Sequence, residues 1–173
     1  VNISGANAQV DDVVIISGTL GDHGIAVMSA REGLNFETDL RSDVAPLNHL
    51  IAAMMNAGEI HVLRDPTRGG LATTLNEIAI QSDLTVELQE TALPVKPQVH
   101  AACEMLGFDP LYVANEGKLV AFVKPEDAEK ILSVMHQTRY GEEAVIIGRV
   151  IRTNHPHVRL RTAIGGTRLI DML

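Results

Sequence analysis

The pattern of apolar and polar positions predicts a chain in which strands and helices alternate. The segment from Asp12 to Gly18 is a short β-branched apolar run ended by glycine, which is typical of a strand buried on both faces. The same pattern predicts strands at 84–88, 119–123, 145–151 and 158–163. Because Gly165 and Gly166 form a tight-turn signal, we expect the last strands to make a hairpin.

Helical spacing marks segments between these strands. One helix is expected to follow Gly24, and another ends at 56–58. The buried face of this second helix is predicted to carry Leu47, Leu50, Ile51, Met54 and Met55. A third helix follows Gly70; its predicted buried residues are Leu71, Leu75, Ile78 and Ala79, and its predicted outward residues are Thr73, Thr74, Asn76 and Glu77.

Two later helices have recognisable ends. Pro97 suits the first turn of one helix, which Gly107 ends, and the other runs from Pro125 to His136. Cys103 lies on the apolar stripe of the first of these, so we interpret its thiol as a small buried hydrophobe rather than a nucleophile. The alternation of strands and helices, without repeats or long linkers, predicts a layered α/β or α+β domain.

Composition and charge narrow the class of protein. With 173 residues, of which 46% are apolar, the chain can form one substantial core, so we expect a single domain over 1–173. A net charge of −8 argues against nucleic-acid binding. No segment resembles a membrane helix or a signal peptide, and one cysteine permits no internal disulfide. We therefore expect no membrane association and a cytoplasmic location.

Three glycine-containing segments carry the candidate chemistry. The first, 17–24, joins a buried strand to a helix, where glycines and the helix N-terminus favour an anion. It lacks the spacing of a dinucleotide-binding loop or a P-loop, and Asp22 and His23 also suit a plain helix start. The second, 64–71, is either a rigid helix entry or a phosphate- or carboxylate-binding loop, because it combines arginines with glycines.

The third segment, Asn115-Glu116-Gly117-Lys118, precedes a strand. By spacing alone it is a hairpin turn with exposed charges. Taken together and in this order, the three segments resemble successive motifs of the HypE family of hydrogenase maturation factors, over essentially the whole chain. The Asp-x-Thr-x-Gly-Gly pattern at 65–70 is similar to that of the wider aminoimidazole ribotide synthetase (PurM) superfamily, whereas Arg68 and the Gly-Asp-His-Gly sequence at 21–24 resemble HypE.

The resemblance implies a fold and a reaction. The fold is a PurM C-terminal-like α+β domain with a mixed sheet and flanking helices, partly ferredoxin-like, in a homodimer. HypE-like proteins use ATP to dehydrate an S-carboxamide on their own C-terminal cysteine to a thiocyanate, for the cyanide ligands of nickel–iron hydrogenases. The implied partners are the carbamoyltransferase HypF and a HypC–HypD complex, and the implied cofactors are ATP and Mg²⁺.

The resemblance also gives candidate residues. Glu116 is the first candidate for the base that takes the amide proton, because a carboxylate on a turn can reach into a cleft. His23 is the second candidate, since a neutral imidazole can exchange protons near pH 7. The expected ATP- or substrate-binding residues are Gly21, Asp22, Gly24, Asp65, Thr67, Arg68, Gly69, Gly70, Asn115 and Lys118. No metal ligand is assigned.

The sequence departs from the family at both ends. It lacks the N-terminal domain that carries most ATP- and metal-binding residues, and it stops short of the tail that ends in cysteine, so we expect this piece to be inactive alone. Two other interpretations stay open. One is another enzyme of the superfamily, a selenophosphate or aminoimidazole ribotide synthetase, and the other is a non-catalytic docking module for a maturation partner.

Overall fold

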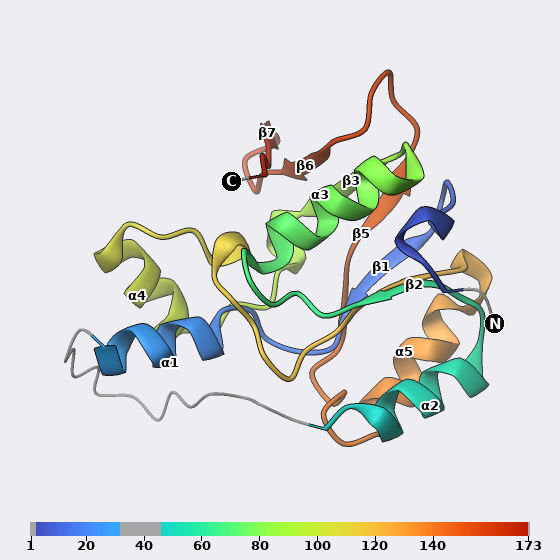
Figure 1. Ribbon diagram of the computed structural model, residues 1–173, viewed down its shortest axis with the longest axis horizontal. Coiled ribbons are helices and arrows are strands. Elements are labelled where there is room, and N and C mark those ends of the chain that lie inside the picture. Colours follow the sequence, from blue (N-terminus) through green and yellow to red (C-terminus); the bar gives the residue numbers. More distant parts are fainter. Residues whose placement is uncertain (1–2, 32–45, 173) are drawn as a thin grey trace.

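Seven strands form one mixed sheet in the order β2-β4-β1-β5-β3-β6-β7 in the computed structural model, which describes residues 3–31 and 46–172 (Figure 1). Neighbouring strands are antiparallel except for β3 and β6, which are parallel. The strands are β1 (Val13–Ile16), β2 (Ile60–Arg64), β3 (Thr85–Gln89), β4 (Val120–Val123), β5 (Val145–Ile151), β6 (Val158–Arg161) and β7 (Thr167–Leu169). This sheet with flanking helices confirms the predicted α+β class.

Helices cover both faces of the sheet. They are α1 (Asp22–Arg31), α2 (Asn48–Ala57), α3 (Gly70–Ser82), α4 (Pro97–Leu106) and α5 (Ala128–His136), with short 3-10 helices η1 (Gly5–Asn7), η2 (Glu90–Ala92), η3 (Pro110–Tyr112) and η4 (Pro125–Asp127). The expected elements are therefore present, although the helix predicted from Pro125 begins with a 3-10 turn and the strand predicted to 163 ends at Arg161.

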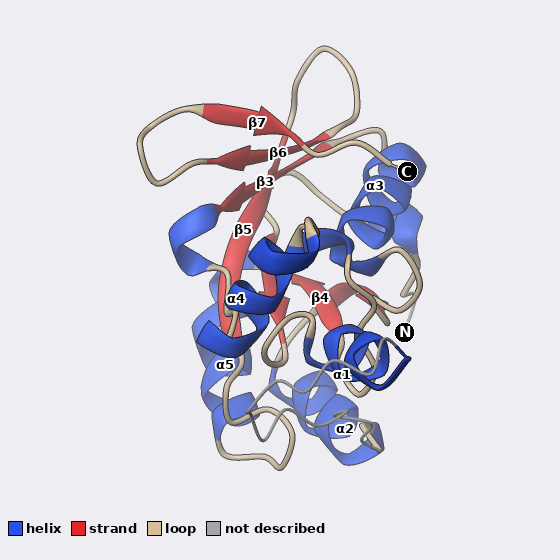
Figure 2. Cartoon of the chain, turned by 90° about the vertical axis from the view of Figure 1, so that its left-hand side faces the viewer, coloured by secondary structure: helices blue, strands red, loops and turns tan. Residues whose placement is uncertain are grey.

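The side chains of each central strand divide between two cores. Val14 and Ile16 of β1 pack with α3, whereas Ile15 packs with α2 and α5 on the opposite face. This division follows from the alternation of side chains along a strand, and it confirms that the strand is buried on both faces. Figure 2 shows β3, β6 and β7 extending the sheet away from α2 and α5. A third, smaller core joins α1 to α4 and includes Cys103, as predicted.

Two predictions about helix faces are wrong. Met55 is 38% exposed, while its neighbour Met54 is fully buried. Thr74 and Asn76 were expected to face solvent, but both are buried. Asn76 donates through Nδ2 to the carbonyls of Ala72 and Ile170, because a segment distant in sequence covers this face of α3. Within residues 3–31 and 46–172, no helix combines the length and the apolar character needed to span a lipid bilayer.

Candidate functional site

The three glycine-containing segments meet at one edge of the sheet. Segment 17–24 follows the end of β1, segment 64–71 follows the end of β2, and segment 115–118 precedes the start of β4. Because β4 lies between β1 and β2 and runs antiparallel to both, these three strand ends lie at the same edge. The topology therefore brings together residues separated by nearly 100 positions in the sequence.

Asn115 joins all three segments. Its Oδ1 accepts a hydrogen bond from the Gly21 N–H at 2.8 Å, and its Nδ2 donates to the Pro66 carbonyl at 3.0 Å. The Asn115 N–H donates to the same Pro66 carbonyl at 3.2 Å, and the Nδ2 also donates to the Val113 carbonyl. The side chain is only 1% exposed. The hairpin turn with exposed charges is therefore not found: the segment links η3 to β4 and holds a buried amide.

Two glycines let the backbones approach closely. Gly70 has a φ of +69°, and a Cβ at this position would lie 2.6 Å from the Leu111 carbonyl oxygen. Gly24 donates its N–H to the Ala114 carbonyl at 3.1 Å, and a Cβ there would lie 2.3 Å from Val113 Cγ1. No other residue has room at these contacts, so the glycines set the spacing between the helix starts and the chain that leads to Asn115.

A buried carboxylate lies at the start of α1. Asp22 is 1% exposed, and its Oδ2 accepts a hydrogen bond from Thr19 Oγ1 at 2.8 Å and pairs with Lys96 Nζ at 2.7 Å. Its Oδ1 is buried without a hydrogen-bond partner among the described residues. Because a buried carboxylate needs a compensating charge, Lys96 and the positive end of α1 together stabilise it. Asp22 is thus more than a surface helix cap.

Sequence reasoning missed Lys96, since a lysine before a helix-starting proline carries no local signal.

Lys118, which the sequence did suggest, lies at the other end of the first segment. A Cβ on Gly18 would lie 3.1 Å from Lys118 Nζ, so the lysine side chain lies across the glycine. Ser17 and Leu119 join the two segments there. The Ser17 N–H donates to the Leu119 carbonyl at 3.0 Å, and the Leu119 N–H donates to Ser17 Oγ at 2.9 Å. The first glycine segment is thus contacted by Lys118 at Gly18 and by Lys96 at Asp22.

Two cavities flank the three segments and separate the candidate residues. Asp65 and Thr67 line one of about 490 Å³, together with Ile51, Leu63, Arg64 and Leu119. His23 and Gly24 line the other, of about 260 Å³, whose further walls are Val27, Met28, Phe108, Tyr112, Val113 and Ala114. Asp65 and Arg68 are exposed, and Arg64 is paired with Glu77. Glu116 is half-buried and is not among the residues that line either cavity.

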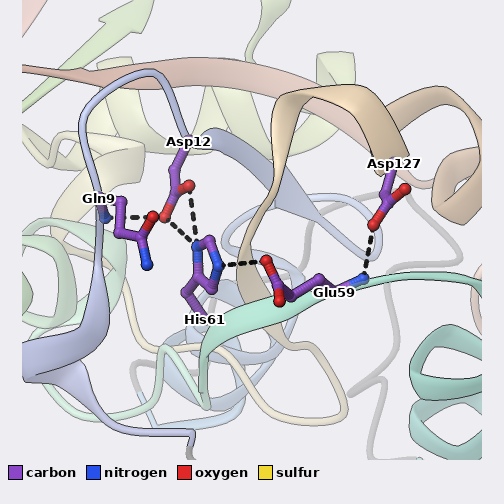
Figure 3. A network of polar contacts seen from close by, with 5 residues as sticks. All are labelled: Gln9, Asp12, Glu59, His61 and Asp127. Atoms are coloured by element: carbon purple, nitrogen blue, oxygen red, sulfur yellow. Dashed lines mark hydrogen bonds and ion pairs between the residues drawn. The ribbon is translucent and has the colours of Figure 1, made fainter.

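The opposite edge of the sheet holds a second polar group that the sequence did not reveal. Figure 3 shows His61 between two carboxylates: its Nδ1 lies 2.8 Å from Asp12 Oδ2 and its Nε2 lies 3.0 Å from Glu59 Oε2. Asp12 precedes β1 and His61 is near the start of β2, so both lie away from the glycine segments. Among the described residues, no group of three or more His, Cys, Asp or Glu side chains is arranged to bind a metal ion.

A family model described as "AIR synthase related protein, C-terminal domain" matches residues 9–161. The chain therefore belongs to this family. Within it, the sequence is similar to carbamoyl dehydratase HypE: it is 54% identical to that of Bradyrhizobium diazoefficiens over 174 residues, covering 99% of this chain and 50% of the relative. It is 42% identical to that of Escherichia coli K12 over 161 residues, covering 93% of this chain and 47% of the relative.

Solved structures agree with this assignment. A structure described as a HypE–HypF complex matches with a TM-score of 0.95 and 50% identity, covering 99% of this chain and 56% of the other. One of HypE in complex with ATP matches with a TM-score of 0.95 and 48% identity, covering 99% and 53%. Thiamine monophosphate kinase from Aquifex aeolicus, at 20% identity and a TM-score of 0.65, shares the fold. The chain spans about half the length of the curated relatives it matches.

Proposed function

We propose that the chain is the C-terminal domain of an ATP-dependent carbamoyl dehydratase of the HypE type. The observation that carries the proposal is the meeting of the three family motifs around the buried side chain of Asn115. An identity of 54% over 99% of the chain to a curated HypE supports it. The resemblance to HypE implies that a second, N-terminal domain supplies the remaining ATP and Mg²⁺ ligands.

The proposed reaction converts a cysteine S-carboxamide to a thiocyanate. The carboxamide oxygen attacks the γ-phosphorus of ATP, ADP leaves, and the NH2 group loses the first of its two protons to give an O-phosphorylated imidate. A base then takes the second N–H proton, the C–O bond breaks, and inorganic phosphate departs with the former amide oxygen as the C≡N bond forms. The amide oxygen is a poor leaving group, so its phosphorylation makes the elimination feasible.

Glu116 is our first candidate for the base. Asn115 fixes the backbone immediately before it, and Gly117 at φ +68° turns the chain after it, so the carboxylate is held on an ordered loop. Glu116 is half-buried, so part of the residue stays accessible to a substrate. His23 is the alternative because it lines the cavity beside α1.

The segments offer two helix N-termini to anionic groups. Segment 17–24 leads into α1 and segment 64–71 into α3, and backbone N–H groups at such positions favour phosphate. Asp65, Thr67 and Arg68 lie at the second, with Gly69 and Gly70, where ATP phosphates, Mg²⁺ or the carboxamide oxygen would bind. We assign Gly21, Asp22, Gly24, Asn115 and Lys118 to the same site as residues that shape it. The proposed partners are a second copy of the protein, HypF and a HypC–HypD complex.

The test uses the full-length protein carrying Glu116→Gln, with the exposed Glu126→Gln as the matched control. ATP hydrolysis is measured together with the mass of the carbamoylated tail. We expect the control to lose water from the carboxamide at the wild-type rate and Glu116→Gln to bind ATP without that loss. If Glu116→Gln dehydrates at the wild-type rate, the base is His23 or lies in the N-terminal domain, and His23→Gln decides between them. Absence of dehydration in the wild-type protein would refute the proposed function.

A further inference from the structure

The C-terminal segment is held by side chains from the elements that carry the site. Asn76 of α3 donates from Nδ2 to the Ile170 carbonyl at 2.9 Å, and the Tyr112 hydroxyl of η3 donates to the Asp171 carbonyl at 2.7 Å. Arg168 pairs with Asp109 at 2.9 Å. Ile170 itself is 2% exposed. Segment 168–171, which is the end of β7 and the two residues after it, is therefore fixed in place, and Figure 2 shows the C-terminal end beside α3.

The two holding elements are parts of the three-segment site. Helix α3 starts at Gly70, at the end of the second segment, and η3 ends at Tyr112, shortly before Asn115. The close approach of Gly70 to the Leu111 carbonyl packs the two elements together. Tyr112 also lines the cavity that contains His23. Tyr112 thus contacts the C-terminal backbone through its hydroxyl and also lines the cavity beside His23.

We infer that Asn76 and Tyr112 form a clamp that fixes where the chain leaves the domain, next to the His23 cavity. Any chain that follows residue 172 starts from this point. The inference rests on the proposed function, in which the substrate group is carried by the protein's own tail. Asn76 and Tyr112 are then positioning residues, because they act on the place from which the tail departs and not on the reacting atoms.

Tethering explains why a fixed departure point matters. The effective concentration of a tethered group falls as the flexible tether becomes longer than the span it must cover. Release of segment 168–171 would add its residues to the flexible tether and move its origin away from the His23 cavity. Loss of one hydrogen bond does not unfold the segment, but it increases the fraction of time in which the segment is detached. The reaction of the tail should slow, whereas the site itself is unchanged.

The experiment compares a tethered with a detached substrate. Tyr112→Phe in the full-length protein removes only the hydroxyl, and Tyr140→Phe is the matched control on the far side of the sheet, at the end of the turn after α5. Dehydration of the carbamoylated tail is measured in cis. Dehydration of a carbamoylated tail peptide is measured in trans, with a protein whose terminal cysteine is replaced by alanine.

We expect Tyr112→Phe to lower the cis rate more than the trans rate, so that the ratio of the cis rate to the trans rate falls. Tyr140→Phe should change neither rate. Equal losses in cis and in trans would overturn the inference, since the hydroxyl would then act on the site or the fold. An unchanged cis rate would overturn it as well.

A second measurement does not depend on the reaction. The Ile170 N–H donates to the Val158 carbonyl at 2.9 Å, so its hydrogen exchange reports detachment of the segment. Tyr112→Phe should accelerate this exchange by about three- to tenfold, corresponding to the loss of one hydrogen bond, while Tyr140→Phe leaves it unchanged. Unaltered exchange in Tyr112→Phe rules the clamp out. If the wild-type protein dehydrates neither substrate, the proposed function fails, and exchange at Ile170 alone decides whether the clamp exists.

Discussion

The Oδ1 atom of Asn115 accepts a hydrogen bond from the Gly21 N–H at 2.8 Å, and the two residues are 94 positions apart. On its other side the same amide donates to the Pro66 carbonyl. A single buried side chain therefore satisfies backbone groups of two other segments, which would otherwise be left without partners when the loops pack together. The amide supplies an acceptor oxygen to one segment and a donor nitrogen to the other.

Replacement of this amide should weaken both the fold and the site. Asn115→Ala leaves the Gly21 N–H without its acceptor, and removal of one partner from a buried hydrogen bond costs about 1–3 kcal/mol. We expect a fall of about 2–4 kcal/mol in the free energy of unfolding, because more than one bond is lost. Chemical denaturation measures it. The exposed Asn154→Ala is the control and should stay within about 0.5 kcal/mol of wild type; a similar small change for Asn115→Ala would refute the joining role.

Gly70 and Gly107 offer a comparison at nearly equal backbone angles. Both have positive φ, +69° and +74°, but a Cβ on Gly70 would meet backbone atoms within 2.8 Å, whereas a Cβ on Gly107 would have nothing within 4 Å. Gly107→Ala should lower the free energy of unfolding by about 1–2 kcal/mol, the penalty of the left-handed conformation. Gly70→Ala adds a clash and should destabilise by several kcal/mol. Equal losses in the free energy of unfolding for the two variants would show that the close approach of Gly70 to Leu111 does not constrain residue 70.

The local pattern of apolar, polar and glycine residues was sufficient to predict most of the helices and strands. The strand predicted at 145–151 is observed with those bounds, because a β-branched run needs only its own composition to favour an extended chain. Glycine after Leu106 ends α4 in the left-handed conformation, again a local property. The family resemblance located the three segments but did not say how they touch.

Long-range polar pairings were not predictable. Asn76 looks like an outward polar residue on an amphipathic helix, yet the carbonyl that covers it belongs to Ile170, which no periodicity relates to α3. Lys96 gives no signal of its pairing with Asp22 for the same reason. Asn115 has the composition of a turn, and only the sheet topology shows that its amide is enclosed. Each of these pairings depends on how elements distant in sequence pack together.

The Cys103 thiol should be chemically inert in the folded protein. It is 2% exposed on α4, and burial raises its pKa, to which the negative charge of Asp109 adds. Since the thiolate is the reactive form, alkylation at pH 8 should be at least about 100-fold slower than in denaturant. Ser133→Cys in a Cys103→Ala background supplies an exposed thiol on α5 as the control, which should react at similar rates in both conditions. Fast alkylation of native Cys103 would contradict the buried assignment.

The last prediction concerns the pH dependence of stability, through His61. Both ring nitrogens face carboxylates, Asp12 and Glu59, and only the protonated imidazole can donate to two acceptors. Burial works to lower the pKa of His61, but the hydrogen bonds to Asp12 and Glu59 and their charges outweigh it, so the net pKa is raised above its usual value of 6.5. The folded protein therefore binds this proton more tightly than the unfolded chain.

The sign follows from proton linkage. A raised histidine pKa contributes stability that is fully present below pH 6.5 and is lost as pH rises through the folded pKa. The side chain of Glu59 is 58% exposed, and solvent screening weakens its interaction with His61. The contact with Asp12 therefore contributes most of the stability that the His61 proton provides. We expect His61→Gln to lower the free energy of unfolding by about 1–3 kcal/mol near pH 6.

The difference in the free energy of unfolding between wild type and His61→Gln should narrow as pH increases. Wild-type His61 then loses its positive charge, and only one of its ring nitrogens can still donate to a carboxylate. Denaturation between about pH 5.5 and pH 9 measures it, a range in which exposed Asp and Glu stay ionised, whereas burial raises the pKa of Asp12. The exposed His100→Gln provides the control, and its curve should run parallel to that of wild type. If the gap between His61→Gln and wild type is constant or widens with pH, the histidine is held neutral between the two carboxylates. One of the two carboxylates would then carry a proton, and burial favours the protonated form of Asp12.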